Sequence, residues 1–179
     1  MIDTARLHLI PATSTLLRAE RAGRDAFAAA IGLAVPAAWP PDLYDADAII
    51  YALSLMARAD FIPKWGSYYI VRRADGHRAP VVIGAGGFKG PPGADRSVEV
   101  GYSILPAFRR RGYATEAVRG WVQFAFESPD VVRVVAQTLA HLTPSIGVMV
   151  NAGFTFAGAG ADPDAPPGEA LVRYELVRP

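Results

Sequence analysis

The chain has 179 residues, of which 51% are hydrophobic, and its formal net charge at pH 7 is +1. This length predicts a single domain over residues 1–179 with a substantial core, and the near-zero charge excludes a general attraction to nucleic acid. The chain has no cysteine, no apolar run long enough to span a bilayer and no signal-peptide pattern, so we expect a cytoplasmic protein without disulfides, thiolate metal sites or a cysteine nucleophile.

The N-terminal third predicts one strand followed by helices. Residues 6–10 alternate polar and apolar side chains and predict a strand that ends at Pro11. A single helix is expected next, capped by Thr13 or Ser14, continuing to Ala30 and terminated near Gly32. Residues 34–44 contain three prolines and predict a stiff, irregular loop, after which Asp45 caps a second helix.

The middle of the chain predicts an antiparallel meander. Residues 66–73, 80–88 and 98–105 have strand character, and turn residues separate them. Three glycines in the second of these strands indicate a bulge or a close neighbour, because glycine weakens a regular strand.

Residues 98–127 form the most informative stretch. An apolar strand with a single acid, Glu99, precedes Pro106, a basic turn at 109–112 and an amphipathic helix. A strand–turn–helix directs free backbone N–H groups toward one point, with the positive end of the helix dipole behind them, which favours phosphate binding. Gly112 would let the backbone approach the anion closely. The alternative interpretation is a solvated arginine cluster, and a P-loop is excluded because no G-K-[ST] follows.

The remaining residues predict a crossover and two closing strands. A parallel strand is expected at 133–139, because the preceding helix requires a crossover connection. Thr143 is expected to cap a short helix with Pro144 at its first position. Residues 154–157 and 169–177 predict closing strands, joined by a mobile loop at 158–168. The whole pattern predicts an α/β fold with a mixed, mostly antiparallel sheet and helices on both faces.

Two motifs resemble those of the GNAT superfamily of N-acetyltransferases. The sequence R-R-R-G-Y-A at 109–114 resembles the pyrophosphate loop R/Q-x-x-G-x-G/A, and its flanks are similar to the branch that contains ribosomal-protein N-terminal acetyltransferases. The sequence T-P-S-I-G-V-M-V-N-A-G-F at 143–154 is similar to the segment N-x-x-S-I-x-V-x-x-x-x-G-F of that branch. Two motifs in this order, each in its strand–helix context, are specific, and they cover the C-terminal half best.

This resemblance implies the acyl-coenzyme A N-acyltransferase (GNAT) fold, with a splayed parallel strand pair that holds the pantetheine arm. It also implies acetyl-coenzyme A as co-substrate and no metal. Backbone amides of the turn, including that of Arg109, would hold the pyrophosphate, and strand amides near Ile104 would polarise the acetyl carbonyl. The expected cofactor-binding residues are Ile104, Arg109, Arg110, Arg111, Gly112, Tyr113, Ala114 and Thr115.

Two residues are candidates for catalysis. Glu99 is either the proton acceptor that an ammonium group requires before attack or merely the polar half of an alternating strand. Ser145 matches the serine of the second motif and is either directed toward the coenzyme or an ordinary first-turn residue. Leu142 and Met149 stand where the resemblance implies a polar asparagine and a tyrosine acid. Protonation of the product thiolate is therefore assigned to Ser145, Tyr113, water or another group.

Other candidate residues carry weaker signals. The three histidines lack metal-ligand spacing, so no metal site is expected. Five N-terminal aromatic residues either line an acceptor cleft or belong to the core: Phe27, Trp39, Tyr44, Phe61 and Trp65.

The leading hypothesis is direct transfer of an acetyl group from acetyl-coenzyme A to a primary amine, either a protein N-terminus or a small amine. The alternative is a non-catalytic acyl-coenzyme A-binding module, which Leu142 and Met149 favour. The expected partners are acetyl-coenzyme A and the amine acceptor, with no nucleic acid and no membrane, and a homodimer is left open.

Overall fold

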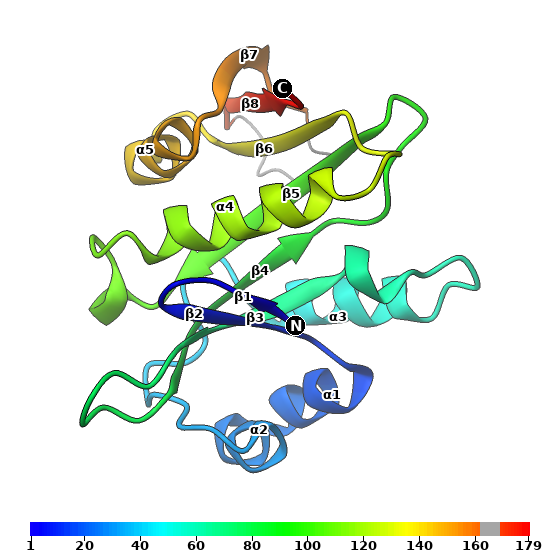
Figure 1. Cartoon of the computed structure of the whole chain (residues 1–179). Helices are drawn as coiled ribbons and strands as arrows, with labels where there is room; N and C mark the ends of the chain where they lie inside the picture. Colours follow the sequence, from blue (N-terminus) through cyan, green and yellow to red (C-terminus); the bar gives the residue numbers. More distant parts are fainter. Residues whose placement is uncertain (162–168) are drawn as a thin grey trace.

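The computed structural model describes residues 1–161 and 169–179, and in this part of the chain eight strands form one mixed sheet (Figure 1). Their order across the sheet is β1-β2-β3-β4-β5-β6-β8-β7. The strands are β1 Ile2–Asp3, β2 Leu7–Pro11, β3 Ser67–Arg72, β4 Val81–Phe88, β5 Ser97–Ile104, β6 Arg133–Leu139, β7 Thr155–Ala159 and β8 Leu171–Val177. The helices are α1 Ser14–Ala22, α2 Arg24–Ile31, α3 Ala46–Met56, α4 Tyr113–Phe126 and α5 Thr143–Ala152.

Strands β5 and β6 run parallel, and every other neighbouring pair in the described sheet is antiparallel. The parallel pairing joins Ser97, Val98 and Glu99 to Arg133, Val134 and Val135 and then stops, although both strands continue. Beyond this point the two strands diverge. The splayed parallel pair, the antiparallel meander and the mixed sheet expected from the sequence are thus confirmed.

Helices cover both faces of the sheet, because side chains alternate between two buried clusters. Along β3, Tyr68 and Ile70 belong to a cluster that includes Trp121 of α4, whereas Tyr69 and Val71 belong to one that includes Phe27 of α2. Figure 1 shows α4 lying across the middle of the sheet, with α5 beside β6 and with α1 and α2 on the side of β2 and β3. Within the described residues, no helix has the length and apolar character needed to cross a membrane.

The helix caps correct two of the sequence predictions. The expected single helix is two helices, because Gly23 has a φ of 129° and ends α1 before α2 begins. Leu142, and not Thr143, occupies the N-cap of α5, and no side chain caps this helix. The predicted caps at Thr13 and Asp45 are confirmed, since both side chains accept hydrogen bonds from the first turns of α1 and α3. Residues 162–168 of the predicted mobile loop lie outside the described residues.

The glycines of β4 permit both features that the sequence indicated, a bulge and close neighbours. The pairing of β3 with β4 shifts register beside Gly84. A Cβ atom at Gly84 would lie 2.3 Å from the carbonyl oxygen of Ser103, and one at Gly86 would lie 2.6 Å from the Trp121 ring. Glycine is therefore required at both positions for β4 to pack against β5 and α4.

A buried carboxylate holds the loop between α2 and α3. Glu20 is 8% exposed and accepts hydrogen bonds from Trp39 Nε1 at 2.7 Å, Tyr69 Oη at 2.7 Å and Tyr44 Oη at 3.1 Å. Burial raises the pKa of Glu20, and the three hydrogen bonds oppose this rise. Trp39 and Tyr44 are thus tied to the packing beneath α1, as expected if these aromatic residues belong to the core and do not line an acceptor cleft. Phe27 and Trp65 are also buried in the core.

We expect Tyr69→Phe to lower the free energy of unfolding by about 1.5–3 kcal/mol, because it removes a hydrogen bond to a buried charged group. Tyr68→Phe is the matched control: its hydroxyl donates to the neutral carbonyl of Lys64, and its loss should cost only about 0.5–1.5 kcal/mol. Urea denaturation measures both values. Equal losses would contradict a special role for the Glu20 carboxylate.

Candidate active site

The turn between β5 and α4 presents unpaired backbone donors. A short 3₁₀ turn at Pro106–Phe108 follows β5, and Gly112, with a φ of 79°, stands at the N-cap of α4. The first helical bond of α4 runs from the Glu116 amide to the Gly112 carbonyl at 3.0 Å. Within the described part of the chain, the N–H groups of residues 112–115 make no hydrogen bond. Four donors at a helix N-terminus form a site suited to a phosphate anion.

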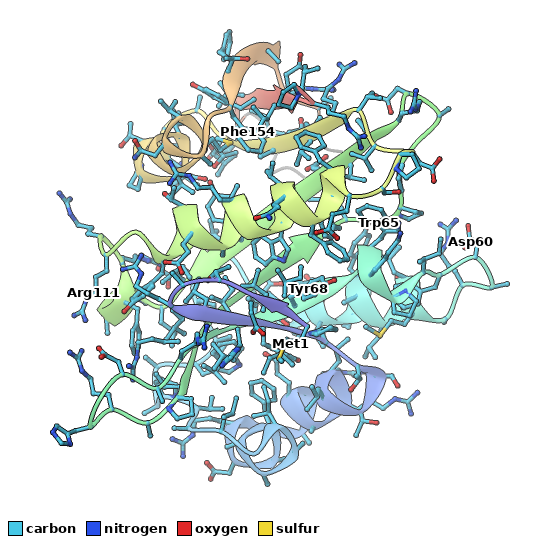
Figure 2. The ribbon with its side chains drawn as sticks, viewed as in Figure 1. Met1, Asp60, Trp65, Tyr68, Arg111 and Phe154 are labelled. Carbon is cyan, nitrogen blue, oxygen red and sulfur yellow. The ribbon has the colours of Figure 1, made fainter. Side chains whose placement is uncertain are left out.

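Arg109 makes hydrogen bonds within the protein through both its backbone amide and its guanidinium. Its backbone N–H donates to the Pro106 carbonyl at 3.2 Å, and the expected bond from this amide to a pyrophosphate stays a prediction. Its guanidinium donates to the Ile104 carbonyl at 2.8 Å and to Asp42 Oδ2 at 2.7 Å. Arg109 therefore fastens the turn to the end of β5 and to the loop before α3. Arg110 and Arg111 are exposed and form no ion pair with the described residues, and Figure 2 shows Arg111 at the N-terminal end of α4.

The N-terminal segment of the chain supports the first turn of α4. Arg6 pairs with Glu116 at 2.6 Å, donates to the Arg111 carbonyl at 3.0 Å and lies 4.7 Å from the Tyr113 ring centre. Burial of Glu116 would raise its pKa, but hydrogen bonds from Thr4 and Arg6 hold this pKa below its ordinary value. The Arg6 guanidinium thus packs on the Tyr113 ring, and the contacts of Arg6 stabilise the turn from the N-terminal segment.

The open edge of β5 directs backbone groups into the gap beside β6. The Leu105 amide donates to Ile83 of β4, and the Glu99 carbonyl accepts from Lys89, so odd-numbered residues of β5 turn their polar groups toward β4. Because backbone direction alternates along a strand, the N–H groups of Tyr102 and Ile104 point the other way, toward the gap. The family resemblance implied that an amide near Ile104 polarises the acetyl carbonyl, and this role stays a prediction.

Glu99 lies at the last paired position of β5 and β6, with its side chain 23% exposed. Gln137 Nε2 donates to Glu99 Oε2 at 3.0 Å, and Lys89 Nζ lies 2.7 Å from Oε1. The side-chain oxygen of Gln137, Oε1, in turn accepts from the Ala161 amide at 2.8 Å. Lys89 and Gln137 therefore hold the Glu99 carboxylate in position, and its role as proton acceptor stays a prediction.

Glu99 opens into a cleft of about 1120 Å³ between α3 and the β4–β5 turn. Asp45, Asp47 and Tyr51 line it on one side and Lys89 on the other, and the Tyr51 hydroxyl donates to the Lys89 carbonyl at 3.3 Å. Lys89, Gln137 and Tyr51 were not identified from the sequence. A polar glutamine within the apolar strand β6 was a usable signal for Gln137.

A second hollow of about 930 Å³ follows the outward face of α4 and includes Gly112 and Thr115. It lies on the side of α4 where residues 1–6 pass, whereas the cleft at Glu99 lies under α3. Thr115 lines this hollow at the helix N-terminus, and its contact with the co-substrate stays a prediction.

Tyr102 was also missed by sequence reasoning. Its hydroxyl donates to the Ser145 carbonyl at 2.9 Å and lies 3.2 Å from Ser145 Oγ, so it bridges β5 to the first turn of α5. Burial raises the pKa of Tyr102 to about 12, and the phenol therefore stays protonated at neutral pH. Met149 is fully buried and Leu142 lies at the α5 N-cap, so neither residue supplies a proton.

The described histidine contacts are ion pairs and not ligand sets. His8 Nδ1 lies 2.5 Å from Asp3 Oδ1, and His141 Nδ1 lies 3.2 Å from Glu169 Oε2. Within residues 1–161 and 169–179, no group of three or more histidine and acidic side chains is arranged to hold a metal ion.

Comparison with known proteins gives matches over most of the chain. Residues 7–155 match the family model described as an acetyltransferase (GNAT) domain. The uncharacterized N-acetyltransferase YjdG of Bacillus subtilis is 25% identical over 138 residues, which is 76% of this chain and 79% of that protein. The FsC-acetyl coenzyme A-N(2)-transacetylase of Aspergillus fumigatus is 33% identical over 84 residues, 45% of this chain and only 36% of that longer protein.

Solved structures show the same fold at low identity. A ribosomal-protein-serine acetyltransferase from Vibrio cholerae superposes with a TM-score of 0.67 at 17% identity, covering 99% of this chain and 97% of that one. An acetyltransferase from Salmonella typhimurium that modifies the N-terminal serine of ribosomal protein L7/L12 gives 0.66 at 14% identity, covering 98% and 97%. The microcin C7 self-immunity acetyltransferase MccE, in complex with acetyl-coenzyme A and AMP, gives 0.63 at 17% identity, covering 98% and 94%.

We expect Gly112→Ala to weaken coenzyme A binding by about tenfold or more, because a methyl group would lie 3.3 Å from Arg6 Nη2 and disturb the N-cap residue beside the free amides. Gly32→Ala is the matched control, since Gly32 also has a left-handed φ, of 68°, but lies at the end of α2. Both changes place alanine in a left-handed conformation and should cost roughly 1–2 kcal/mol of stability. Calorimetry that finds the same coenzyme A affinity in both folded variants would overturn the phosphate site.

Proposed function

The chain belongs to the GNAT family of acetyltransferases, and we propose that it moves an acetyl group from acetyl-coenzyme A to a primary amine by direct transfer. The observation that carries this proposal is the arrangement around β5. A cluster of free amides follows the end of the strand, and a cleft with a held carboxylate opens on one of its faces. An anionic co-substrate and a cationic acceptor thus have separate sites that meet at one strand.

The residues around the gap fit the co-substrate. The N–H groups at the start of α4, together with Arg110 and Arg111, supply donors and positive charge for a pyrophosphate. The diverging strands leave unpaired amides at Tyr102 and Ile104 for the arm and the acyl carbonyl. Acetyl-coenzyme A supplies the activated acetyl group. Since the chain contains no cysteine to carry that group, the amine is expected to attack it directly.

The cleft supports an amine as acceptor. Asp45, Asp47 and Glu99 give it three carboxylates, and Glu99 takes the amine proton directly or through water. An α-amino group has a pKa of about 7.7–8.0, compared with about 10.4 for a lysine side chain, so it is partly unprotonated near pH 7. We therefore propose a protein N-terminus or a small α-amine over a lysine side chain. The two solved ribosomal-protein acetyltransferases, which share the fold, support this choice.

The proton for the leaving thiolate is assigned to the hydroxyl pair of Tyr102 and Ser145. These two groups lie together where β5 faces the first turn of α5, and the phenol is fully protonated at neutral pH. The two hydroxyls belong to different elements, β5 and α5, so loss of one leaves the other in place.

The remaining parts of the proposal concern the whole protein. We propose one catalytic domain over residues 1–179 and a cytoplasmic location, and assembly as a homodimer stays a prediction. A non-catalytic acyl-coenzyme A-binding module is the second candidate, because Leu142 and Met149 replace polar residues and Lys89 pairs with Glu99. Incubation with acetyl-coenzyme A and a panel of amines distinguishes the two: an enzyme releases free thiol in an amine-dependent manner, whereas a binding module does not.

We expect Glu99→Gln to lower turnover of an α-amine peptide by about a hundredfold near pH 7 without changing coenzyme A affinity, because it removes the proton acceptor. Part of the loss should be recovered as the pH rises to about 9, since more of the amine is then already unprotonated. Glu127→Gln, beyond the C-terminal end of α4, is the control. If Glu99→Gln matches the parent across the whole pH profile, Glu99 is only the polar half of a strand.

We expect Ser145→Ala to lower turnover by about tenfold or less, because the Tyr102 hydroxyl still donates. Combining it with Tyr102→Phe should lower turnover by more than the product of the two single effects, which is the signature of residues that substitute for one another. Steady-state rates at saturating acetyl-coenzyme A measure this coupling. A loss of about a thousandfold from Ser145→Ala alone would identify Ser145 as the sole acid.

A further inference from the structure

Gly101 is a glycine that neither the backbone nor the packing of the free protein requires. A Cβ atom built on it meets no heavy atom of the described residues within 4 Å, and its φ lies outside the left-handed region. The glycines of β4 are different: a Cβ atom at Gly84 or Gly86 would lie within 2.6 Å of a neighbour. The space beside Gly101 is open.

The position of this space is defined by its neighbours along β5. Side chains alternate along a strand, so Gly101 shares a face with Glu99 and Ser103. Glu99 is held by Lys89 and Gln137, and Ser103 Oγ donates to the Asp42 carbonyl at 2.5 Å. Both flanking side chains are therefore fixed, and the opening between them lies over Gly101.

The opening also lies at the gap between the diverging strands. Pairing of β5 with β6 ends at Glu99 and Val135, two residues before Gly101. The next backbone groups that face the gap are those of Tyr102 and Ile104, on which the proposed site for the acyl carbonyl depends. Glu99 lines the cleft, and Gly101 is the next residue on the same face of β5 in the direction of Tyr102 and Ile104. A group that extends from the cleft toward these two amides therefore has Gly101 in its path.

We propose that Gly101 determines acceptor specificity: its missing side chain leaves the space that is filled by the substituent on the carbon bearing the acceptor amine. This inference rests on the proposed function. It names the acceptor class as α-branched primary amines, such as the N-terminus of a peptide. In an α-amine, the carbon that bears the nitrogen also carries two carbon substituents, so this acceptor needs lateral room at the point of attack. A linear alkylamine does not.

The first test uses the absence of native cysteine to report on the space directly. Gly101→Cys places a single thiol over the opening, and Ser54→Cys places one on the exposed surface of α3 outside the cleft. In the protein without coenzyme A, N-ethylmaleimide should alkylate both thiols at rates within about tenfold of each other. A thiol at position 101 that reacts as slowly as a buried one would overturn the inference, because the space would then be closed.

The second test asks whether the opening faces the acetyl group. With acetyl-coenzyme A, the thiolate introduced by Gly101→Cys should attack the acetyl carbonyl, forming a new thioester while the bond to the coenzyme breaks and the released thiolate takes a proton. Intact-protein mass spectrometry should show this acetylation about a hundredfold faster than in Ser54→Cys, owing to proximity. Equal rates in the two variants, with normal coenzyme A affinity by calorimetry, would overturn the inference and leave the proposed function standing.

The third test addresses the acceptor class. Gly101→Ala should raise KM for a peptide α-amine by about tenfold while changing that of a linear alkylamine much less, with unchanged coenzyme A affinity. Circular dichroism checks that the variant is folded. Equal effects on both amines would overturn the specificity role. Failure of the parent protein to acetylate either amine would instead count against the proposed function, and the alkylation result would still decide whether the space is open.

Discussion

The divergence of β5 from β6 is the constraint on which the rest of the structure depends. Strands that part leave backbone N–H and C=O groups without partners, and such groups are costly unless something satisfies them. Here Arg109 takes the Ile104 carbonyl, and the amides facing the gap are left for a ligand. The turn, the α4 N-terminus and the loop before α3 are all arranged around this unpaired edge.

Side chains alternate along β5, so the groups to which we assign different roles lie on its two opposite faces. Even-numbered side chains such as Val100 and Tyr102 pack toward α4 and α5. Glu99, Gly101 and Ser103 share the opposite face, on which Glu99 lines the cleft under α3. A single strand therefore separates Glu99 and the proposed acceptor cleft from Tyr102 and the other groups beside α5. Its backbone lies between them, which is why its small residue at position 101 bears on what can pass.

The loop between α2 and α3 contacts both β5 and the turn that precedes α4. Its Trp39 and Tyr44 are fixed by the buried Glu20, and its Asp42 contacts both Arg109 and Ser103. The proposed anion site and the proposed acceptor cleft share this loop, which holds them in a defined relative position. Such bracing matters because group transfer depends on keeping two reactants within a few tenths of an ångström of the productive geometry.

Local periodicity, proline and glycine were enough to predict the strand–turn–helix at residues 98–127, the meander, the parallel crossover at 133–139 and most helix caps. The sequence did not reveal the break at Gly23, since the apolar pattern continues across it and only packing on the sheet decides where the helix bends. Nor did it reveal that Arg109 is engaged by Asp42, that Gln137 and Lys89 hold Glu99, or that Tyr102 meets Ser145. These contacts join residues from 10 to 67 positions apart, and only the tertiary structure brings such distant side chains within bonding distance.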